Sequence, residues 1–186
     1  MMTIRAMLPE KTIDAASLQL RPLRPGDAPG IVDGLGDFEV TRWLARVPYP
    51  YSLDEAERFL AWERMQRPVS AEKVYAIDRG AGLIGVISLR DAGPRPVLGY
   101  WLARAHWGKR YMSEAVAALV ADTFADPGVI EIQSGVFAGN ERSLALQKRL
   151  GFEITGQSVQ HNLALGHDLA HIDTALTRAR LTELKA

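Results

Sequence analysis

The 186-residue chain contains no cysteine. This absence excludes disulfides, thiolate metal ligands and a cysteine nucleophile, and it agrees with a location in the reducing cytoplasm, which we expect. An excess of either charge is also missing, because 22 Lys and Arg residues balance 22 Asp and Glu residues without a long like-charged run. The balance argues against general nucleic-acid binding.

Long hydrophobic runs are missing as well. No run reaches the roughly 18 apolar residues of a membrane span, and residues 1–16 lack the apolar core of a signal peptide. We therefore expect no association with a membrane. The length predicts one domain with a substantial core. We place this domain at residues 17–180, with residues 1–16 as an N-terminal extension, because no periodicity precedes residue 17.

Hydrophobic periodicity predicts an α/β (α+β) domain with about seven strands and about four helices. Three helices should begin after caps at Asp27, Ser52 and Asn140, and the fourth, at 109–124, follows a basic turn. Strands are expected near 18–23, 73–78, 83–90, 97–103, 130–137, 153–165 and 169–178. Glycine-containing hairpins should join the second strand to the third, at 79–82, and the last two strands, at Gly166-His167-Asp168.

The helix at 109–124 lies between two predicted strands, at 97–103 and 130–137. A crossover of this kind pairs its strands in parallel, within a sheet that is otherwise mostly antiparallel. The short turn before the helix is basic, through Lys109 and Arg110. Unpaired backbone N–H groups and the helix dipole also favour an anion there. The turn is thus either a phosphate site or an ordinary turn with two solvated basic residues.

Three motifs resemble the GNAT superfamily of acyl-coenzyme A dependent N-acetyltransferases, and specifically its ribosomal-protein N-terminal acetyltransferase (RimJ/RimL-like) subgroup. The first comprises Leu98-Gly99-Tyr100-Trp101-Leu102, Trp107-Gly108-Lys109 and Met112-Ser113-Glu114-Ala115. The second is Asn140 and Ser143 followed by Leu150-Gly151-Phe152. The third is the opening Leu18-Gln19-Leu20-Arg21-Pro22-Leu23. Contact with a ribosomal protein is compatible with the neutral net charge.

The resemblance implies a single GNAT-like domain whose sheet is splayed at the central parallel pair, with acetyl-CoA (CoA) as the cofactor. A backbone N–H of the first of these two strands would polarise the thioester carbonyl. The cofactor-binding residues that it implies are Tyr100, Trp101, Leu102, Trp107, Gly108, Lys109, Arg110, Tyr111, Met112, Ser113 and Asn140. Read without the resemblance, Asn140 is a helix cap.

Two residues depart from the family pattern. Arg110 stands where the family has a glycine, which lets the backbone approach the phosphates closely, so that the large side chain must point away or bind the phosphates itself. Gln147 stands where many members place a tyrosine thought to protonate the leaving thiolate, and glutamine is no general acid. Both departures favour an alternative function, a non-catalytic acyl-CoA-binding regulatory module.

Acetyl transfer to an amine requires a neutral amine, a polarised thioester carbonyl and a proton for the sulfur. Keeping an amine neutral at pH 7 costs roughly 1 kcal/mol for an α-amino group and roughly 5 kcal/mol for lysine.

By resemblance, Ser143 is the candidate acid, although it is equally a hydroxyl in the first turn of a helix. Histidine exchanges protons near neutral pH, so His161 and His171 are candidate bases, unless they only pack or lie on the surface. We expect no metal site.

By resemblance, the acceptor site would include Trp43, Tyr49 and Tyr51, and aromatic rings suit a cationic amine. The alternative is that these rings fill the core. The leading hypothesis is an acetyl-CoA-dependent N-acetyltransferase that acts by direct transfer in a ternary complex. Its acceptor is a primary amine, on a protein N-terminus or a small molecule. Both a monomer and a homodimer remain open.

Overall fold

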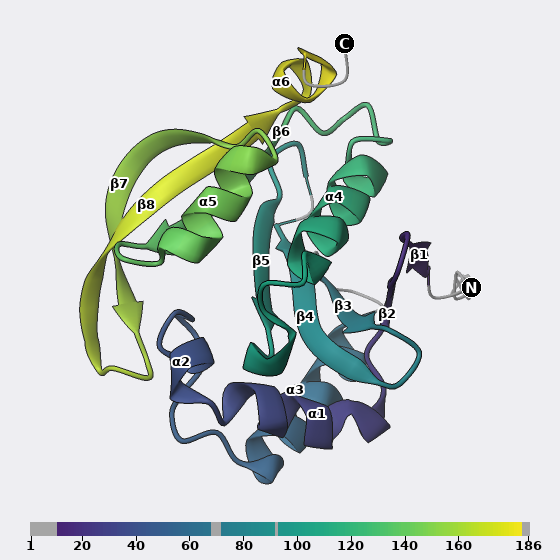
Figure 1. Ribbon diagram of the computed structural model, residues 1–186, viewed down its shortest axis with the longest axis vertical. Coiled ribbons are helices and arrows are strands. Elements are labelled where there is room, and N and C mark those ends of the chain that lie inside the picture. Colours follow the sequence, from purple (N-terminus) through teal and green to yellow (C-terminus); the bar gives the residue numbers. More distant parts are fainter. Residues whose placement is uncertain (1–10, 68–71, 92, 184–186) are drawn as a thin grey trace, which may run out of the picture.

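An eight-stranded sheet runs through the protein, in the order β1-β2-β3-β4-β5-β6-β8-β7 (Figure 1). The computed structural model describes residues 11–67, 72–91 and 93–183. Its strands are β1 (Ile13–Asp14), β2 (Gln19–Pro22), β3 (Lys73–Asp78), β4 (Leu83–Arg90), β5 (Val97–Leu102), β6 (Glu131–Phe137), β7 (Glu153–Asn162) and β8 (His167–Thr177). All neighbouring strands are antiparallel except β5 and β6. The predicted mixed, mostly antiparallel sheet is thereby confirmed.

The strand count is eight rather than seven because β1 pairs with β2 through Ile13 and Asp14. This strand lies within residues 1–16, which we expected to precede the domain, and Ile13 belongs to the hydrophobic core. A two-residue strand is too short to show the alternation on which the prediction relied. The sheet therefore begins four residues before the predicted domain boundary.

Helices cover both faces of the sheet. The described helices are α1 (Ala28–Leu35), α2 (Phe38–Thr41), α3 (Leu53–Gln66), α4 (Tyr111–Thr123), α5 (Glu141–Arg149) and α6 (Arg178–Glu183), with short 3-10 turns at Pro25–Asp27 and Arg104–His106. The four predicted helices are present, whereas α2 and α6 are too short to have shown a helical period. On β3, Tyr75 and Ile77 pack toward α4, and Val74 and Ala76 pack toward α1 and α3. This alternation is the two-residue period of a strand buried on both faces.

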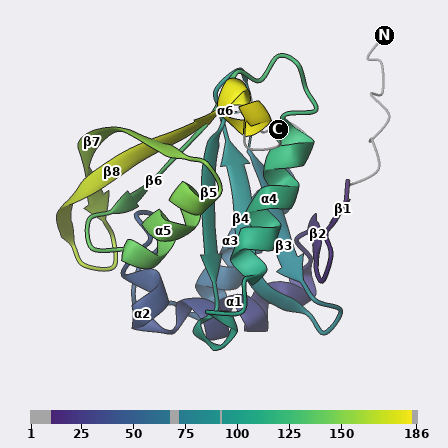
Figure 2. The same ribbon diagram turned by 45° about the horizontal axis from the view of Figure 1, so that its top comes forward.

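The parallel strands β5 and β6 separate along their length. Helix α4 is the crossover between them, as predicted, and the register of this pair holds only Val97 opposite Gln133. By contrast, β5 pairs with β4 along its whole length, from Arg90 opposite Val97 to Gly85 opposite Leu102. Figure 2 shows β6 and the β7–β8 hairpin leaning away from β5. The predicted splay is therefore present and lies at the centre of the sheet.

The β7–β8 hairpin reaches back to the loop that follows α2. Leu163 N donates to Ala45 O at 3.1 Å, and Asn162 Nδ2 donates to Arg42 O at 2.9 Å. The predicted hairpin is present, and its turn comprises residues 163–166, so that it includes Gly166, whereas His167 and Asp168 already belong to β8. In β8, His167 pairs with Asn162. The hairpin thus closes one side of the space between the sheet and α3.

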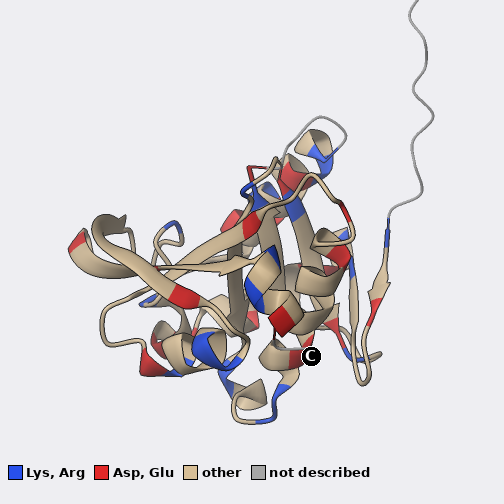
Figure 3. Cartoon of the chain, turned by 90° about the horizontal axis from the view of Figure 1, so that it is seen from above, with Lys and Arg blue, Asp and Glu red and all other residues tan. Residues whose placement is uncertain are grey.

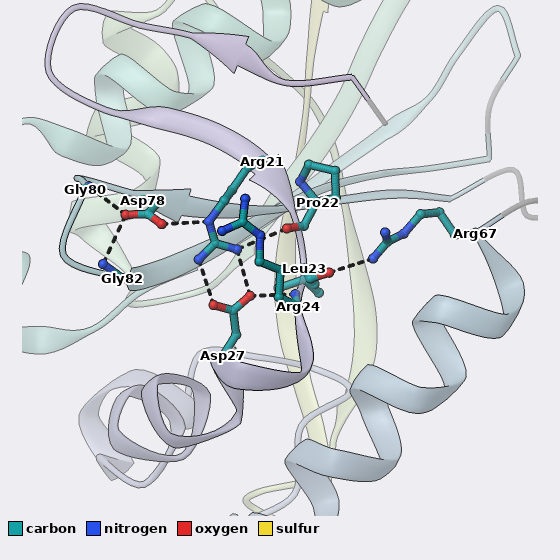
Figure 4. Close-up of polar contacts among 9 residues, drawn as sticks. All are labelled: Arg21, Pro22, Leu23, Arg24, Asp27, Arg67, Asp78, Gly80 and Gly82. Atoms are coloured by element: carbon teal, nitrogen blue, oxygen red, sulfur yellow. Dashed lines mark hydrogen bonds and ion pairs between the residues drawn. The ribbon is translucent and has the colours of Figure 1, made fainter. Parts of the chain in front are cut away.

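A buried arginine holds the N-terminal half together (Figure 4). Arg21 on β2 donates to both carboxylate oxygens of Asp27, at 2.8 and 2.7 Å, and to Asp78 on β3 at 2.6 Å. Asp27 precedes α1 as predicted, but its side chain does not cap this helix and instead accepts from Arg24 N at 2.7 Å. Instead of the expected helix cap, Asp27 therefore forms an ion pair with Arg21 of β2.

The charged residues are interspersed by sign over the described elements (Figure 3). Some exposed charges form short pairs, such as Arg58 with Asp54 at 2.6 Å along α3. Among the described residues, no helix is long and apolar enough to cross a membrane.

Candidate functional site

The first of two pockets at the splay lies between β5, the start of α4 and α5, and we call it the α4 pocket. Its volume is about 940 Å³, within the range of small-molecule sites. It is lined by all of the predicted cofactor-binding residues except Lys109. The Lys109 ammonium instead donates to Ala105 O at 2.9 Å. The residues of the first motif thus surround one cavity, together with Asn140, which precedes α5, and Ser143 in the first turn of α5.

The turn before α4 has an unusual backbone. Gly108 has φ = 74° and Arg110 has φ = 65°, the left-handed region that glycine adopts without strain. Arg110 is the N-cap of α4 and makes no side-chain cap hydrogen bond. The first N–H groups of α4 therefore have no acceptor within the helix. Together with the Arg110, Arg142 and Arg149 side chains that line the pocket, they favour an anion.

Trp107 fixes the position of this turn. Its indole Nε1 donates to Leu102 O at 2.7 Å, at the end of β5, and the Arg142 guanidinium lies over its ring at 4.9 Å. Nearby, burial first and then the Lys109 and Arg79 charges lower the pKa of His106, which therefore favours its neutral form. Positive charge at the α4 pocket thus comes from arginine rather than from histidine.

The second pocket lies between the sheet and α3, and we call it the α3 pocket. Its volume is about 960 Å³. Of the three predicted acceptor residues, Trp43 and Tyr51 line it. Burial, with a smaller effect of the Glu55 charge, raises the pKa of Tyr51 to about 12. Tyr49 lines neither pocket, because its ring packs against Phe38 with centroids 5.0 Å apart.

The two pockets meet where β5 and β6 separate. The lining residues that they share include Tyr100 and Trp101 on β5, and Gly135 and Val136 on β6. A ligand in the α4 pocket and a ligand in the α3 pocket would therefore approach each other between the two strands. An arrangement of this kind suits group transfer between two bound molecules.

His171 faces the α3 pocket from β8, close to the junction of the pockets. Its Nδ1 lies 2.8 Å from Asp173 Oδ1, and its side chain is only 12% exposed. Gly135 makes room for the ring, since a Cβ at this position would lie 2.2 Å from His171 Cε1. His171 is thus a histidine at a pocket wall with a carboxylate partner that orients its ring, an arrangement that suits a general base.

The other histidine candidate lies elsewhere. His161 on β7 pairs with Asp168 at 2.7 Å, its side chain is 53% exposed, and it lines neither pocket. The hairpin register places Ser158, not His161, opposite His171. Among the described residues, no group of three or more potential ligands is arranged to hold a metal ion.

A chain of polar side chains crosses the splay. The Tyr100 and Ser143 hydroxyls lie 2.7 Å apart. Gln147 Nε2 donates to the Tyr100 hydroxyl at 3.2 Å and to Ser134 Oγ at 3.0 Å, and Gln147 Oε1 accepts from Thr174 at 2.7 Å. Gln147, which the sequence marked only as a departure, is 1% exposed and joins α5 to three strands. No local signal in the sequence could have revealed these contacts.

The comparisons with known proteins agree with this geometry. Residues 17–153 match the family model described as "Acetyltransferase (GNAT) domain". The uncharacterized N-acetyltransferase p20 of Bacillus licheniformis is 26% identical over 160 residues, which cover 84% of this chain and 90% of p20.

Solved structures share the fold. Mycobacterium smegmatis RimJ in complex with CoA-disulfide superposes with a TM-score of 0.76 at 18% identity, covering 93% of this chain and 90% of RimJ. The Salmonella typhimurium acetyl transferase that modifies the N-terminal serine of 50S ribosomal subunit protein L7/L12 gives a TM-score of 0.77 at 19% identity, covering 90% of this chain and 99% of that chain. Because the family model matches most of the sequence, the chain belongs to the GNAT family of acetyltransferases.

Proposed function

We propose that this protein is an acetyl-CoA-dependent N-acetyltransferase that transfers acetyl directly to a primary amine in a ternary complex. The observation that carries the proposal is the junction of the two pockets between β5 and β6. We assign acetyl-CoA to the α4 pocket and the amine to the α3 pocket. When bound, acetyl-CoA supplies the activated acetyl group.

The α4 pocket fits a coenzyme with a pyrophosphate. The free N–H groups at the start of α4 match phosphate oxygens, and the arginines that line the pocket supply the opposite charge. Beyond Val97, β5 no longer pairs with β6, so backbone groups of this strand are available to a pantetheine arm. A backbone N–H of residues 100–102 would polarise the thioester carbonyl.

Proton transfers need an acid and a base near the junction. Ser143 lines the α4 pocket and can give a proton to the leaving sulfur. His171, held by Asp173, lines the α3 pocket and can accept the proton that the amine loses. We do not assign a role to His161, because its side chain lies outside both pockets.

We propose a protein N-terminus as the acceptor, with a small amine as the second candidate. An α-amino group needs little help to become neutral. Among the described residues that line the α3 pocket, the only histidine is His171, and one base is enough for such an amine. The fold shared with the enzyme that modifies the L7/L12 N-terminal serine supports the same choice.

The first experiment measures thermal stabilisation by CoA and acetyl-CoA, with thiol release followed in the same samples against N-terminal peptides and small amines. At about 100 times its Kd, a ligand stabilises by about 2.7 kcal/mol, or roughly 5–10 °C for a protein of this size. Stabilisation with acceptor-dependent release supports the proposal. Stabilisation without release across the panel supports the acyl-CoA-binding regulatory module, and no stabilisation contradicts both.

Variants connect the activity to the site. His171→Gln should lower kcat at least about 10-fold, because it removes the base, whereas the matched change His161→Gln should leave kcat unchanged. Equal effects of these two changes would contradict the assignment of the base.

A further inference from the structure

Tyr100 is a partly buried tyrosine whose hydroxyl contacts two side chains of α5. Its Oη lies 2.7 Å from Ser143 Oγ and accepts from Gln147 Nε2 at 3.2 Å. A phenol has a single proton to donate. Which way this proton points therefore decides what the Ser143 hydroxyl does.

The contacts around Gln147 determine which hydrogen bond the Tyr100 oxygen accepts. Ser134 Oγ is 3.1 Å from the backbone oxygen of Leu98, which can only accept, so the single Ser134 proton points to Leu98. Ser134 Oγ must then accept from Gln147, which identifies the Gln147 atom on this side as the amide nitrogen. The Gln147 oxygen correspondingly accepts from Thr174 at 2.7 Å.

With the amide oriented in this way, its second N–H points to the Tyr100 oxygen. The other close partner of Tyr100 Oη is Ser143 Oγ at 2.7 Å, a contact in which either hydroxyl can be the donor. In the arrangement in which Tyr100 donates, Ser143 accepts this bond, and its own proton is free to point into the α4 pocket, which Ser143 lines. A hydroxyl that accepts a hydrogen bond is also a better donor, because hydrogen bonds in a chain polarise one another.

We propose that Tyr100 is a positioning residue for the acetyl transfer: held by Gln147, it orients the Ser143 hydroxyl as the proton donor to the leaving sulfur. This inference rests on the proposed function. Burial raises the pKa of Tyr100, against the smaller opposing effects of its bonds to Ser143 and Gln147, so that the phenol keeps the proton that this role requires.

The step balances in atoms and electrons. When the carbon–sulfur bond breaks, its electron pair stays on sulfur, and the Ser143 proton moves to sulfur and forms the thiol. The pair left on Ser143 Oγ is stabilised by the Tyr100 O–H bond. The acceptor nitrogen forms the new bond to the acetyl carbon and loses one proton, which passes through His171 or water and restores the Ser143 hydroxyl.

A double-mutant cycle tests the proposal, with Tyr100→Phe, Ser143→Ala and the double variant compared with wild type in steady-state acetylation. Because an acid contributes about 10²–10⁴-fold, we expect Ser143→Ala to lower kcat about 100-fold and Tyr100→Phe about 10-fold. The KM for acetyl-CoA should change less than about 3-fold in each, since each change removes only one hydroxyl from the wall of the α4 pocket. In the Ser143→Ala background, Tyr100→Phe should change kcat less than about 2-fold.

Two further variants separate positioning from structure. Thr174→Val removes one of the two contacts that orient Gln147, the other being that with Ser134, and leaves Tyr100 and Ser143 in place. It should lower kcat severalfold, again only when Ser143 is present. Tyr75→Phe is the matched control. Tyr75 is 7% exposed in the same core but lines neither pocket, so kcat should stay within about 2-fold of wild type.

Independent, multiplicative losses in the cycle would overturn the inference, as would a Tyr100→Phe effect on KM alone. Either result leaves the proposed function intact, provided that the wild type releases thiol in the presence of an acceptor. If the wild type binds acetyl-CoA but releases no thiol with any acceptor, the proposed function itself fails, and the inference fails with it.

Discussion

The change Arg21→Met removes the guanidinium that joins β2, the start of α1 and the β3–β4 hairpin. Arg21 and Asp27 are almost fully buried, with side chains 4% and 6% exposed. Removing one partner of a buried pair leaves an uncompensated charge and costs about 3–5 kcal/mol. Asp78 suffers less, because it still accepts from Gly80 N and Gly82 N.

This cost is a large share of the stability of a domain, about 5–15 kcal/mol. For a protein of this size, 1 kcal/mol corresponds to about 2–4 °C. The midpoint of thermal unfolding should therefore fall by roughly 6–20 °C, as measured by circular dichroism. Well below the midpoint, kcat should be unchanged, because Arg21 lines neither pocket.

The control is Arg58→Met, which breaks an ion pair with Asp54 whose side chains are 68% and 73% exposed. Exposed helical pairs contribute about 0.3–0.5 kcal/mol, so its midpoint should move by only about 1–2 °C. The double variant Arg21→Met/Asp27→Asn removes the stranded charge and should recover part of the loss. If Arg21→Met shifts the midpoint no more than Arg58→Met, the reasoning from burial is wrong.

Three further predictions concern charge and backbone geometry. Replacing Arg110 by glycine relieves a left-handed residue and should stabilise the free protein by up to about 1 kcal/mol, while calorimetry should show weaker CoA binding because a basic side chain is lost; tighter binding would mean that the side chain obstructs the site. Hydrogen bonds outweigh burial and lower the pKa of Asp78, so its stabilisation is present at neutral pH and should be lost in urea titrations as the pH falls below about 4, a slope that Asp78→Asn should reduce. A Cβ at Gly135 would lie 2.2 Å from His171 Cε1 and 2.7 Å from the backbone oxygen of Ile172, so Gly135→Ala should lower kcat at least about 10-fold. At Gly99 the nearest atom to such a Cβ is 3.5 Å away, and Gly99→Ala should be tolerated.

Sequence reasoning succeeded where the stabilising contact is local. The predicted cap of α3 at Ser52 is present and forms a capping box, with Ser52 N donating to Glu55 at 2.7 Å and Glu55 N donating to Ser52 at 3.2 Å. Gly80 and Gly82 have positive φ in the predicted β3–β4 hairpin. These signals lie within a few residues of the element that they specify, so a single sequence contains them completely.

The errors involve side-chain partners that the fold, rather than a local motif, selects. Asp27 has the residue type and position of a helix cap, and only the fold brings it against the Arg21 side chain, which also reaches Asp78, 57 residues away. In the candidate site, the motif located the α4 turn, but chain order could not tell that the Lys109 side chain bonds Ala105 O. Periodicity predicts which elements form, whereas side-chain partners across the sheet depend on register and packing.

The separation of β5 from β6 accounts for both the cavity and the polar chain within it. Pro96 O still accepts a backbone N–H from Gln133, at 2.9 Å, whereas two residues further along β5, Leu98 O accepts the Ser134 hydroxyl. This hydroxyl bond, which stands in place of a bond between the strands, fixes the orientation of Gln147, and Gln147 in turn donates to the Tyr100 oxygen. If β5 and β6 were paired along their whole length, there would be no space between them for acetyl-CoA, and Leu98 O would bond a backbone N–H of β6 instead of the Ser134 hydroxyl. The geometry that admits the substrates is thus also the one that orients the proposed proton donor.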